Sequence, residues 1–227
     1  MHDSGRVVTT VIAAMRMEAR TARPLIRGGC SQCISGIGVE RARAAALAAV
    51  EGGARRLLVW GCAGGLIHHL APGTVVVPRV VLSAAGERFE ADAVWRAELL
   101  ARAPAGVPVN DGNLVTTARP LGDPGEKGGL AQRSGAIAAD METAAIAAIA
   151  AARGLPFAAV RAIADPLEFA LPRAVTAVVS ERFLAPEVAL RLLGRPQDIA
   201  AVRRLAGFTR AAKSSLAAFA RSLAATP

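Results

Sequence analysis

The sequence predicts an α/β protein in which a twisted, mixed and largely parallel sheet lies between two layers of helices. Two observations support this prediction. Short segments rich in Val, Ile and Leu alternate along the chain with longer, alanine-rich segments that have helical character. The chain has 227 residues, of which 53% are hydrophobic, so it is long enough to bury one large core.

The expected strands are short and apolar, and several end in glycine or a carboxylate. The most distinctive is "RLLVWGCAGG", a buried strand that runs into a glycine turn. The expected helices end at glycine, as at Gly52 and Gly154. Strands are expected at 6–15, 30–38, 56–65, 74–84, 112–117, 136–141 and 155–165, and helices at 39–53, 91–103, 124–135 and 142–154.

The last part of the chain predicts a helical extension. We place a catalytic domain at 1–174 and the extension, packed on the same domain, at 175–227. Between 196 and 224 apolar residues recur at helical spacing and basic residues fall between them. The segment therefore predicts a helix that packs on the domain with a solvated face, or one that lies on an anionic membrane surface.

The net charge is +9, and nearly all of the positive charge is arginine, since Lys127 and Lys213 are the only lysines. A net charge of this size makes nucleic acid and an anionic membrane surface candidate partners. No zinc finger, clear helix-turn-helix or aromatic and basic RNA-binding motif accompanies it, so we expect no nucleic-acid partner. Every apolar run is interrupted before it could span a bilayer, and the N-terminus reads as a first strand. We expect a cytoplasmic protein, with peripheral membrane contact through the C-terminal helices left open.

Several motifs that could indicate a metal site, a dinucleotide site or a cysteine nucleophile lack residues that such a site needs. Cys30 and Cys33 form C-x-x-C, but no second pair completes a metal site, and in a strand the two side chains point to opposite faces. The glycines at 36 and 38 lack the third glycine of a dinucleotide-binding fingerprint, because Arg41 takes that position. Cys62 follows a strand but has only loop histidines as possible bases. No metal site is expected.

Carboxylates follow three expected strands. Glu18 comes after the first, Asp140 and Glu142 follow "AIAA", and Asp165 ends "AAVRAIAD". Each taken singly is more often a helix cap. Together they would converge on one cleft, because ligand sites in such sheets lie beyond the carboxyl ends of strands. An acid, a base and a sugar ligand are what cleavage of a glycosidic bond requires.

Five segments together resemble the superfamily of purine nucleoside phosphorylases and methylthioadenosine nucleosidases. They are "AAMRMEA", "GIGVERARAA", "GCAGGL", "AADMETAAIA" and "VRAIAD", and the resemblance extends from about residue 8 to 166. The Asp-Met-Glu variant and the basic tail look most like the hopanoid-associated phosphorylases, which remove adenine from adenosylhopane to leave ribosylhopane. The resemblance implies a small-molecule nucleoside substrate, a homo-oligomer and no cofactor, with inorganic phosphate as a possible co-substrate.

The resemblance also implies a role for each matching residue. Glu18 would activate the attacking water, Asp165 would protonate purine N7, and Arg161 would help to hold the nucleophile. Burial or a second anion would have to keep Asp165 protonated near neutral pH. Glu142 would bind the ribose hydroxyls. The implied substrate-binding residues are Glu142, Met141, Cys62, Gly64 and Val115.

Three departures from the family pattern bear on the reaction. Cys62 replaces the usual serine of the glycine turn, and Val59 stands where hexameric phosphorylases carry a phosphate-binding arginine. An apolar residue cannot replace a guanidinium group, so water is favoured as nucleophile; Arg16 or Arg20 keeps phosphorolysis open. The short segment 83–92 should open the 5′ side of the pocket to a bulky apolar group.

Alternatives therefore remain at this point. Within the superfamily, the protein would instead be a 5′-methylthioadenosine/S-adenosylhomocysteine nucleosidase or a phosphate-dependent purine nucleoside phosphorylase. Outside enzymes, it would be a nucleoside- or membrane-binding protein on the same fold.

Overall fold

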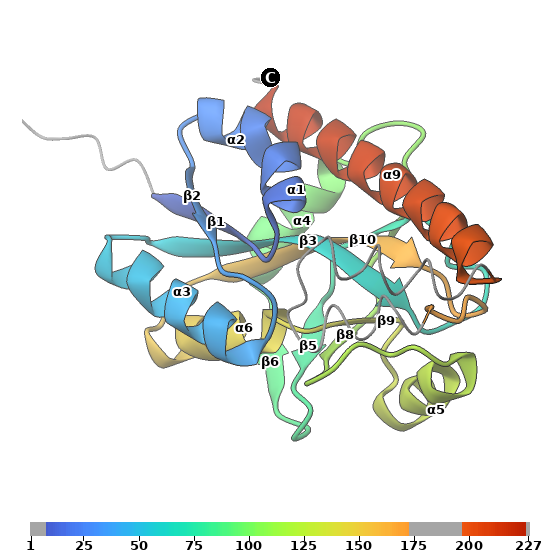
Figure 1. The fold of residues 1–227 in the computed structure, drawn as a ribbon. Coiled ribbons are helices and arrows are strands. Elements are labelled where there is room, and N and C mark those ends of the chain that lie inside the picture. Colours follow the sequence, from blue (N-terminus) through green and yellow to red (C-terminus); the bar gives the residue numbers. More distant parts are fainter. Residues whose placement is uncertain (1–7, 173–196, 226–227) are drawn as a thin grey trace, which may run out of the picture.

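The computed structural model describes residues 8–172 and 197–225, which form three layers (Figure 1). The middle layer is a ten-stranded sheet in the order β6-β5-β8-β9-β3-β10-β4-β7, and β1 pairs with both β2 and β3. Six of the nine strand pairings are parallel, and the three antiparallel ones are β3–β9, β4–β10 and β5–β6. The predicted fold class, a mixed and largely parallel sheet between helices, is confirmed.

The longest strands, β3 and β10, lie side by side at the centre of the sheet. Their register pairs Phe157 with Leu57 and Asp165 with Gly64, so the two strands end together. The strand bounds are β1 Thr9–Ala13, β2 Ser31–Ile34, β3 Arg56–Gly65, β4 Val75–Val76, β5 Val80–Leu82, β6 Arg88–Glu90, β7 Val109–Asn110, β8 Leu114–Thr116, β9 Ala138–Asp140 and β10 Phe157–Asp165.

The helices pack on both faces of the sheet and divide the core in two. Alanines of α3 and α6 cover one face, and α2, α4 and α9 cover the other, where Trp60 is fully buried. Cys33 packs against the first core and Cys30 against the second, which confirms that they point to opposite faces. The helix bounds are α1 Arg16–Ala19, η1 Arg20–Ala22, α2 Arg23–Arg27, α3 Val39–Glu51, α4 Ala93–Ala101, α5 Pro124–Ser134, α6 Thr143–Ala152 and α9 Gln197–Ala224.

The single strand predicted at 74–84 is wrong. It is two short strands, β4 and β5, that occupy distant places in the sheet. Pro78 lies between them and has no N–H to give to a ladder, so the chain leaves one neighbour and joins another. The helices at 16–27 were not predicted, because α1, η1 and α2 are each five residues or shorter and carry no periodic pattern.

The helix predicted at 196–224 is present as α9. Its apolar side lies in the core beside β10 and α2, and the ring of Phe219 meets that of Trp60 edge-to-face at 6.5 Å between centroids. The predicted domain boundary at 174 lies outside the described residues. No helix within the described ranges combines the length and the apolar character needed to cross a membrane.

Candidate active site

A cavity of about 220 Å³ opens where β1, β3 and β10 end. Most of the wall that the described residues form is apolar, and four of their carboxylates reach the cavity. Of the site residues that the sequence predicts, Glu18, Cys62, Gly64, Met141, Glu142 and Asp165 line it; Arg161 and Val115 do not. The convergence of the strand-end acids on one cleft is therefore confirmed.

Glu18 is held by two backbone amides. It lies in α1, directly after β1, and is 2% exposed. Its Oε2 accepts from the Met15 N–H at 2.9 Å, and its Oε1 accepts from the Cys62 N–H at 2.8 Å. Burial raises the pKa of Glu18, and the positive charge of Arg161 opposes that rise. A fixed carboxylate with a raised pKa is a group suited to accept a proton.

Arg161 lies behind the cavity wall, 1% exposed, in the middle of β10. A side chain at Gly61 on neighbouring β3 would collide with it, since a Cβ there would come 2.5 Å from Arg161 Nη1 and 2.6 Å from Glu18 Oε1. Glycine at this position is therefore required for the arginine and Glu18 to face each other. Nη1 is buried and has no hydrogen-bond partner among the described residues. Arg161 supports the acids from behind and does not itself reach the cavity.

Asp140 organises the start of α6. It accepts from the Thr143 backbone N–H at 3.2 Å and from the Thr116 hydroxyl at 2.7 Å, and it also accepts from the Thr143 hydroxyl. Its Oδ2 lies 2.5 Å from Arg161 Nη2. These contacts satisfy the first backbone N–H of α6 and pair the buried guanidinium, so Asp140 has a structural role.

Glu142 is the most unusual acid of the site. Its Oε1 accepts from the Gly38 N–H at 2.9 Å, and Gly38 has a φ of 101°, a conformation that favours glycine. Its Oε2 lies 3.5 Å from Arg161 Nη2. Burial raises the pKa of Glu142 to about 7, against the pull of Arg161 and with a further push from Asp140. Such a carboxylate is ready to accept hydrogen bonds from hydroxyl groups of a ligand.

Asp165 ends β10 and meets Lys127, a residue that the sequence analysis did not single out. Lys127 Nζ donates to Asp165 Oδ2 at 2.6 Å, and Lys127 is 1% exposed. Burial raises the pKa of Asp165, while Lys127 lowers it. A Cβ at Gly64 would lie 3.2 Å from Asp165 Oδ2, so this glycine gives the carboxyl its room. The available signal for Lys127 was its rarity, as one of two lysines in an arginine-rich chain.

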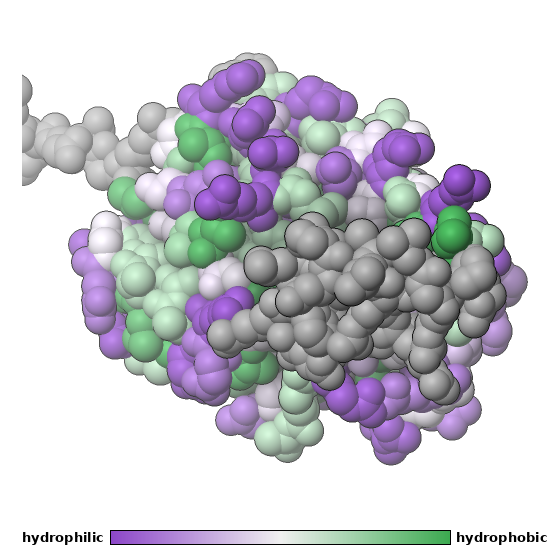
Figure 2. Space-filling view, viewed as in Figure 1, coloured by the Kyte–Doolittle hydropathy of each residue, from purple (hydrophilic) through white to green (hydrophobic). Residues whose placement is uncertain are grey.

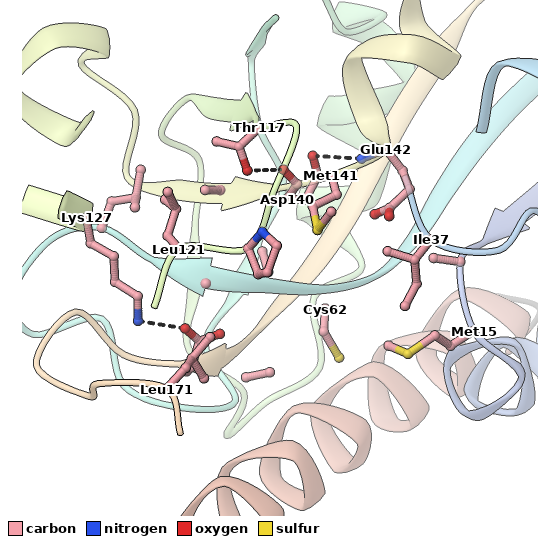
Figure 3. Close-up of a pocket in the computed structure, with 18 of the residues that line it drawn as sticks. Met15, Ile37, Cys62, Thr117, Leu121, Lys127, Asp140, Met141, Glu142 and Leu171 are labelled. Carbon is pink, nitrogen blue, oxygen red and sulfur yellow. Dashed lines mark hydrogen bonds and ion pairs between the residues drawn. The ribbon is translucent and has the colours of Figure 1, made fainter. Parts of the chain in front are cut away.

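The charged groups separate into two ends of the cavity. Figure 3 shows Met15, Ile37 and Glu142 at one end and Lys127 with Leu171 at the other. Glu18 contacts Met15 and therefore belongs to the first end, and Asp165 belongs to the second through Lys127. A ligand that spans the cavity meets Glu18 and Glu142 at one end, with Asp140 beside them on Arg161, and Asp165 at the other end.

Two of the predicted substrate-binding residues, Val115 and Cys62, differ from the others in their surroundings. Val115, in β8, is 3% exposed and lines a neighbouring hollow between β5, β8 and α5, so its substrate-binding role stays a prediction. Cys62 lines the cavity, but burial and then the charge of Glu18 raise the pKa of its thiol strongly. A thiol in that state is a poor nucleophile, which agrees with the rejection of a cysteine mechanism. Among the described residues, no cluster of three or more His, Cys, Asp or Glu could hold a metal.

The family model described as the phosphorylase superfamily matches residues 16–186. The chain belongs to the phosphorylase superfamily. It is accordingly an enzyme that cleaves a glycosidic bond, by hydrolysis or by phosphorolysis. The match spans every element that contributes an acid to the cavity. The comparison with curated protein sequences gave no match.

Solved structures share this fold at low sequence identity. A 5′-methylthioadenosine/S-adenosylhomocysteine nucleosidase from Neisseria meningitidis, in complex with methylthio-immucillin-A, has a TM-score of 0.67 and 21% identity over 96% of this chain and 100% of that chain. The corresponding nucleosidase of Helicobacter pylori has a TM-score of 0.66 and 16% identity, over 81% and 94%. Futalosine hydrolase of the same organism has 0.66 and 16%, over 80% and 93%.

Proposed function

We propose that this phosphorylase-superfamily enzyme cleaves the N-ribosyl bond of a 5′-substituted adenosine and releases adenine. The observation that carries the proposal is the separation of the cavity into an end with Glu18 and Glu142 and an end with Asp165. Breaking this bond places positive charge on the ribose and negative charge on the departing purine. Two acids near the sugar and a proton donor near the base fit that distribution.

Each acid has a role that follows from its contacts. Glu142 accepts hydrogen bonds from the ribose hydroxyls, with Met141 packed against the sugar. Glu18, fixed by the N–H groups of Met15 and Cys62, takes a proton from the attacking water. Asp165 delivers a proton to purine N7, so that adenine leaves as a neutral molecule. Arg161 offsets part of the negative charge of the buried acids at the sugar end.

Water fits this site better than phosphate as the nucleophile. Among residues 8–172 and 197–225, no arginine lines the cavity, and Val59 is buried in the core. Arg16 and Arg20 are exposed and do not line the cavity. Binding of phosphate commonly uses guanidinium or ammonium groups, and the one cation that the described part of the chain places in this wall, Lys127, is engaged by Asp165. These observations support hydrolysis.

The apolar wall supports a bulky apolar 5′ substituent, and we propose adenosylhopane, with ribosylhopane as the product. Ile37 and Met15 lie near the sugar end, and Leu205 of α9 contributes to the wall. The segment between β5 and α4 holds only the short strand β6. The fold neighbours that act on 5′-methylthioadenosine keep that smaller substrate as the second candidate.

The test supplies the purified protein with adenosylhopane or 5′-methylthioadenosine and measures free adenine, with and without phosphate. We expect adenine from adenosylhopane without phosphate, and a free reducing sugar as the second product. Asp165→Asn should lower the rate by about 10²-fold or more while the protein stays folded. Release of adenine from neither nucleoside would overturn the proposal and favour a nucleoside-binding protein, in which Asp165→Asn leaves ligand affinity unchanged.

The same proposal places the enzyme at a membrane surface, because a lipid-like substrate resides there. Four exposed arginines, Arg20, Arg23, Arg27 and Arg221, surround one hollow formed by η1, α2 and the end of α9, and none of the described residues that line it is an acid. Figure 2 shows hydrophilic residues along these helices. Such a surface suits anionic headgroups. We propose cytoplasmic, peripheral binding, and a homo-oligomeric state as in other family members.

A further inference from the structure

Lys127 is the most deeply buried ammonium group among the described residues, and it lies behind the acid that serves the leaving purine. It comes from the first turn of α5, with 1% of its surface exposed. Burying a charge costs several kcal/mol unless partners compensate for the lost water. The burial of Lys127 therefore calls for partners that offset this cost and for a chemical role that explains a lysine at this position.

The partners of Lys127 account for all three of its protons. Nζ donates to Asp165 Oδ2 at 2.6 Å, to the Pro166 carbonyl at 2.9 Å and to the Phe169 carbonyl at 3.2 Å. An ammonium group has three N–H groups, which matches these three acceptors. We therefore take Lys127 as the ammonium ion and Asp165 as the carboxylate of the resting pair. Asp165 Oδ1 accepts no hydrogen bond from the described residues and is left for a ligand.

In the proposed reaction Asp165 delivers a proton to the purine, but a resting carboxylate has no proton to give. Resting on that reaction, we infer that Lys127 is a positioning residue that stores the proton which Asp165 passes to the purine. The lysine also fixes the orientation of the Asp165 carboxyl, because two backbone carbonyls of the turn after β10 hold its ammonium group in place. Lys127 acts through Asp165, which touches the purine.

The proton balance closes over one turnover. As the C1′–N9 bond breaks, its electron pair goes to the purine, and the proton moves from Lys127 to the Asp165 carboxyl and from there to N7. Lys127 is then neutral and Asp165 is again a carboxylate. On the sugar side, water forms the new bond to C1′ and gives its proton to Glu18. Release of the products lets Glu18 lose that proton to solvent and Lys127 regain one.

The surroundings favour such a shared proton. The pKa of Asp165 is raised by burial and lowered by Lys127, and no other charge acts on it among the described residues. Glu126 pairs with Arg119 and not with Lys127. The guanidinium group of Arg204, in α9, lies over the Phe169 ring, 5.5 Å from its centroid. Glu168 pairs with His68 at the surface, and Glu18, Asp140, Glu142 and Arg161 lie toward the sugar end. In a low-dielectric site a ligand that displaces water makes the neutral pair less costly.

The direction of a pH shift tests the inference. The experiment measures kcat/KM against pH for the wild type, Lys127→Met and Lys127→Arg. If Lys127 stores the proton, Lys127→Met leaves a lone carboxyl as the donor, and the alkaline limb moves to lower pH by at least about one unit. Lys127→Arg keeps the charge and the donors, but arginine does not release its proton, so it should not restore the rate. If the alkaline limb of the kcat/KM profile moves to higher pH in Lys127→Met, or does not move, the inference is overturned.

A second measurement separates proton supply from general damage to the site. The substrate is a 4-nitrophenyl β-riboside with the same 5′ substituent, whose leaving group departs without a proton. We expect Lys127→Met to lose about 10²-fold on the adenosine substrate and less than about 3-fold on the nitrophenyl riboside. Equal losses on both would show a merely structural role. A wild type that releases adenine from no nucleoside would overturn the proposed function instead, which is a distinct result.

Discussion

Gly61 shows how one small residue determines the chemistry of its neighbours. It lets Arg161 and Glu18 approach across β3, where any Cβ would overlap both side chains. The result is a buried cluster of Glu18, Asp140 and Glu142 around a single guanidinium group, which leaves the acids underneutralised. Acids in that condition gain most from a ligand that develops positive charge beside them, as the ribose does when its N-ribosyl bond breaks.

The raised pKa of Glu142 makes a prediction about stability. Its pKa is about 7 in the folded protein and near 4.5 in the unfolded chain, so the folded state holds a proton that the unfolded state has lost between these values. The free energy of unfolding should therefore fall as pH rises from 4.5 to 7. In Glu142→Gln this fall should be smaller, by about 1–3 kcal/mol in total. Urea unfolding of both proteins at several pH values measures it.

Two controls make that measurement specific. Glu126→Gln removes a carboxylate from the surface and should leave the pH dependence nearly unchanged, because its partner Arg119 is solvated. Glu18→Gln should also reduce the fall, since burial raises the pKa of Glu18 as well. An equal pH dependence in the wild type and Glu142→Gln would contradict the buried, partly protonated state of Glu142.

At the scale of elements, the second half of α9 packs its apolar side into the core of the protein, so this side does not lie on a membrane. Ala212, Leu216, Phe219 and Ala220 are fully buried against β10 and α2. The apolar side of its second half is thus already used by the protein and is not free to insert into lipid. The basic residues remain outside, which restricts any contact with a membrane to electrostatic attraction.

Truncation of Phe219 tests how much α9 contributes to the fold. Phe219→Ala removes a fully buried ring that meets Trp60, and should lower the free energy of unfolding by about 3–5 kcal/mol. Ile199→Ala, on the same helix at 42% exposure, should change it by less than about 1 kcal/mol. Chemical denaturation measures both, and similar values for the two variants would argue against the packing of α9 on the sheet.

The sequence predicted some elements closely and missed others for identifiable reasons. β3 has the bounds expected from "RLLVWGCAGG", and α3 ends at Glu51, directly before Gly52, because long apolar runs and glycine stops are local signals. The split at Pro78 was missed because both halves are apolar, and only their different neighbours in the sheet separate them. Lys127 was missed because its partners come from β10 and the turn after it, 38 to 42 residues away.

At the scale of the whole molecule, the positive charge is unevenly distributed. The exposed residues of α1, η1 and α2 include Arg16, Arg20, Arg23 and Arg27, and the one acid in these helices, Glu18, is buried in the active site. In α9 a further set is exposed, namely Arg203, Arg204, Arg210 and Arg221. The tertiary structure brings α2 beside the C-terminal end of α9, so Arg20, Arg23 and Arg27 form one basic surface with Arg221, although these residues are far apart in the chain (Figure 1).

Charge reversal on this surface should abolish binding to anionic vesicles. Each arginine near such a membrane contributes about 1 kcal/mol, and salt screens the attraction. We expect the wild type to sediment with vesicles of phosphatidylglycerol and phosphatidylcholine at low salt, and the triple variant Arg20→Glu, Arg23→Glu, Arg27→Glu to remain in the supernatant. Vesicle co-sedimentation at two salt concentrations is the measurement.

The matched control has the same net charge in other places. Arg43, Arg55 and Arg153 are exposed and lie away from α2 and α9, on α3, before β3 and after α6. Their triple reversal to glutamate should keep most of the vesicle binding. If both triple variants bind equally, or if the wild type binds neutral vesicles as well as anionic ones, the basic surface of α2 and α9 is not a membrane contact.

The sequence by itself determined the layered α/β fold, the acids at the strand ends and the resemblance to a nucleoside-cleaving superfamily. These follow from local patterns, because periodicity, glycine stops and short motifs are properties of neighbouring residues. Only the tertiary structure decided that Asp140 pairs with Arg161, that Lys127 lies behind Asp165, and that α9 is part of the core. Each of those depends on burial and on contacts between distant segments, and such contacts exist only after the chain has folded.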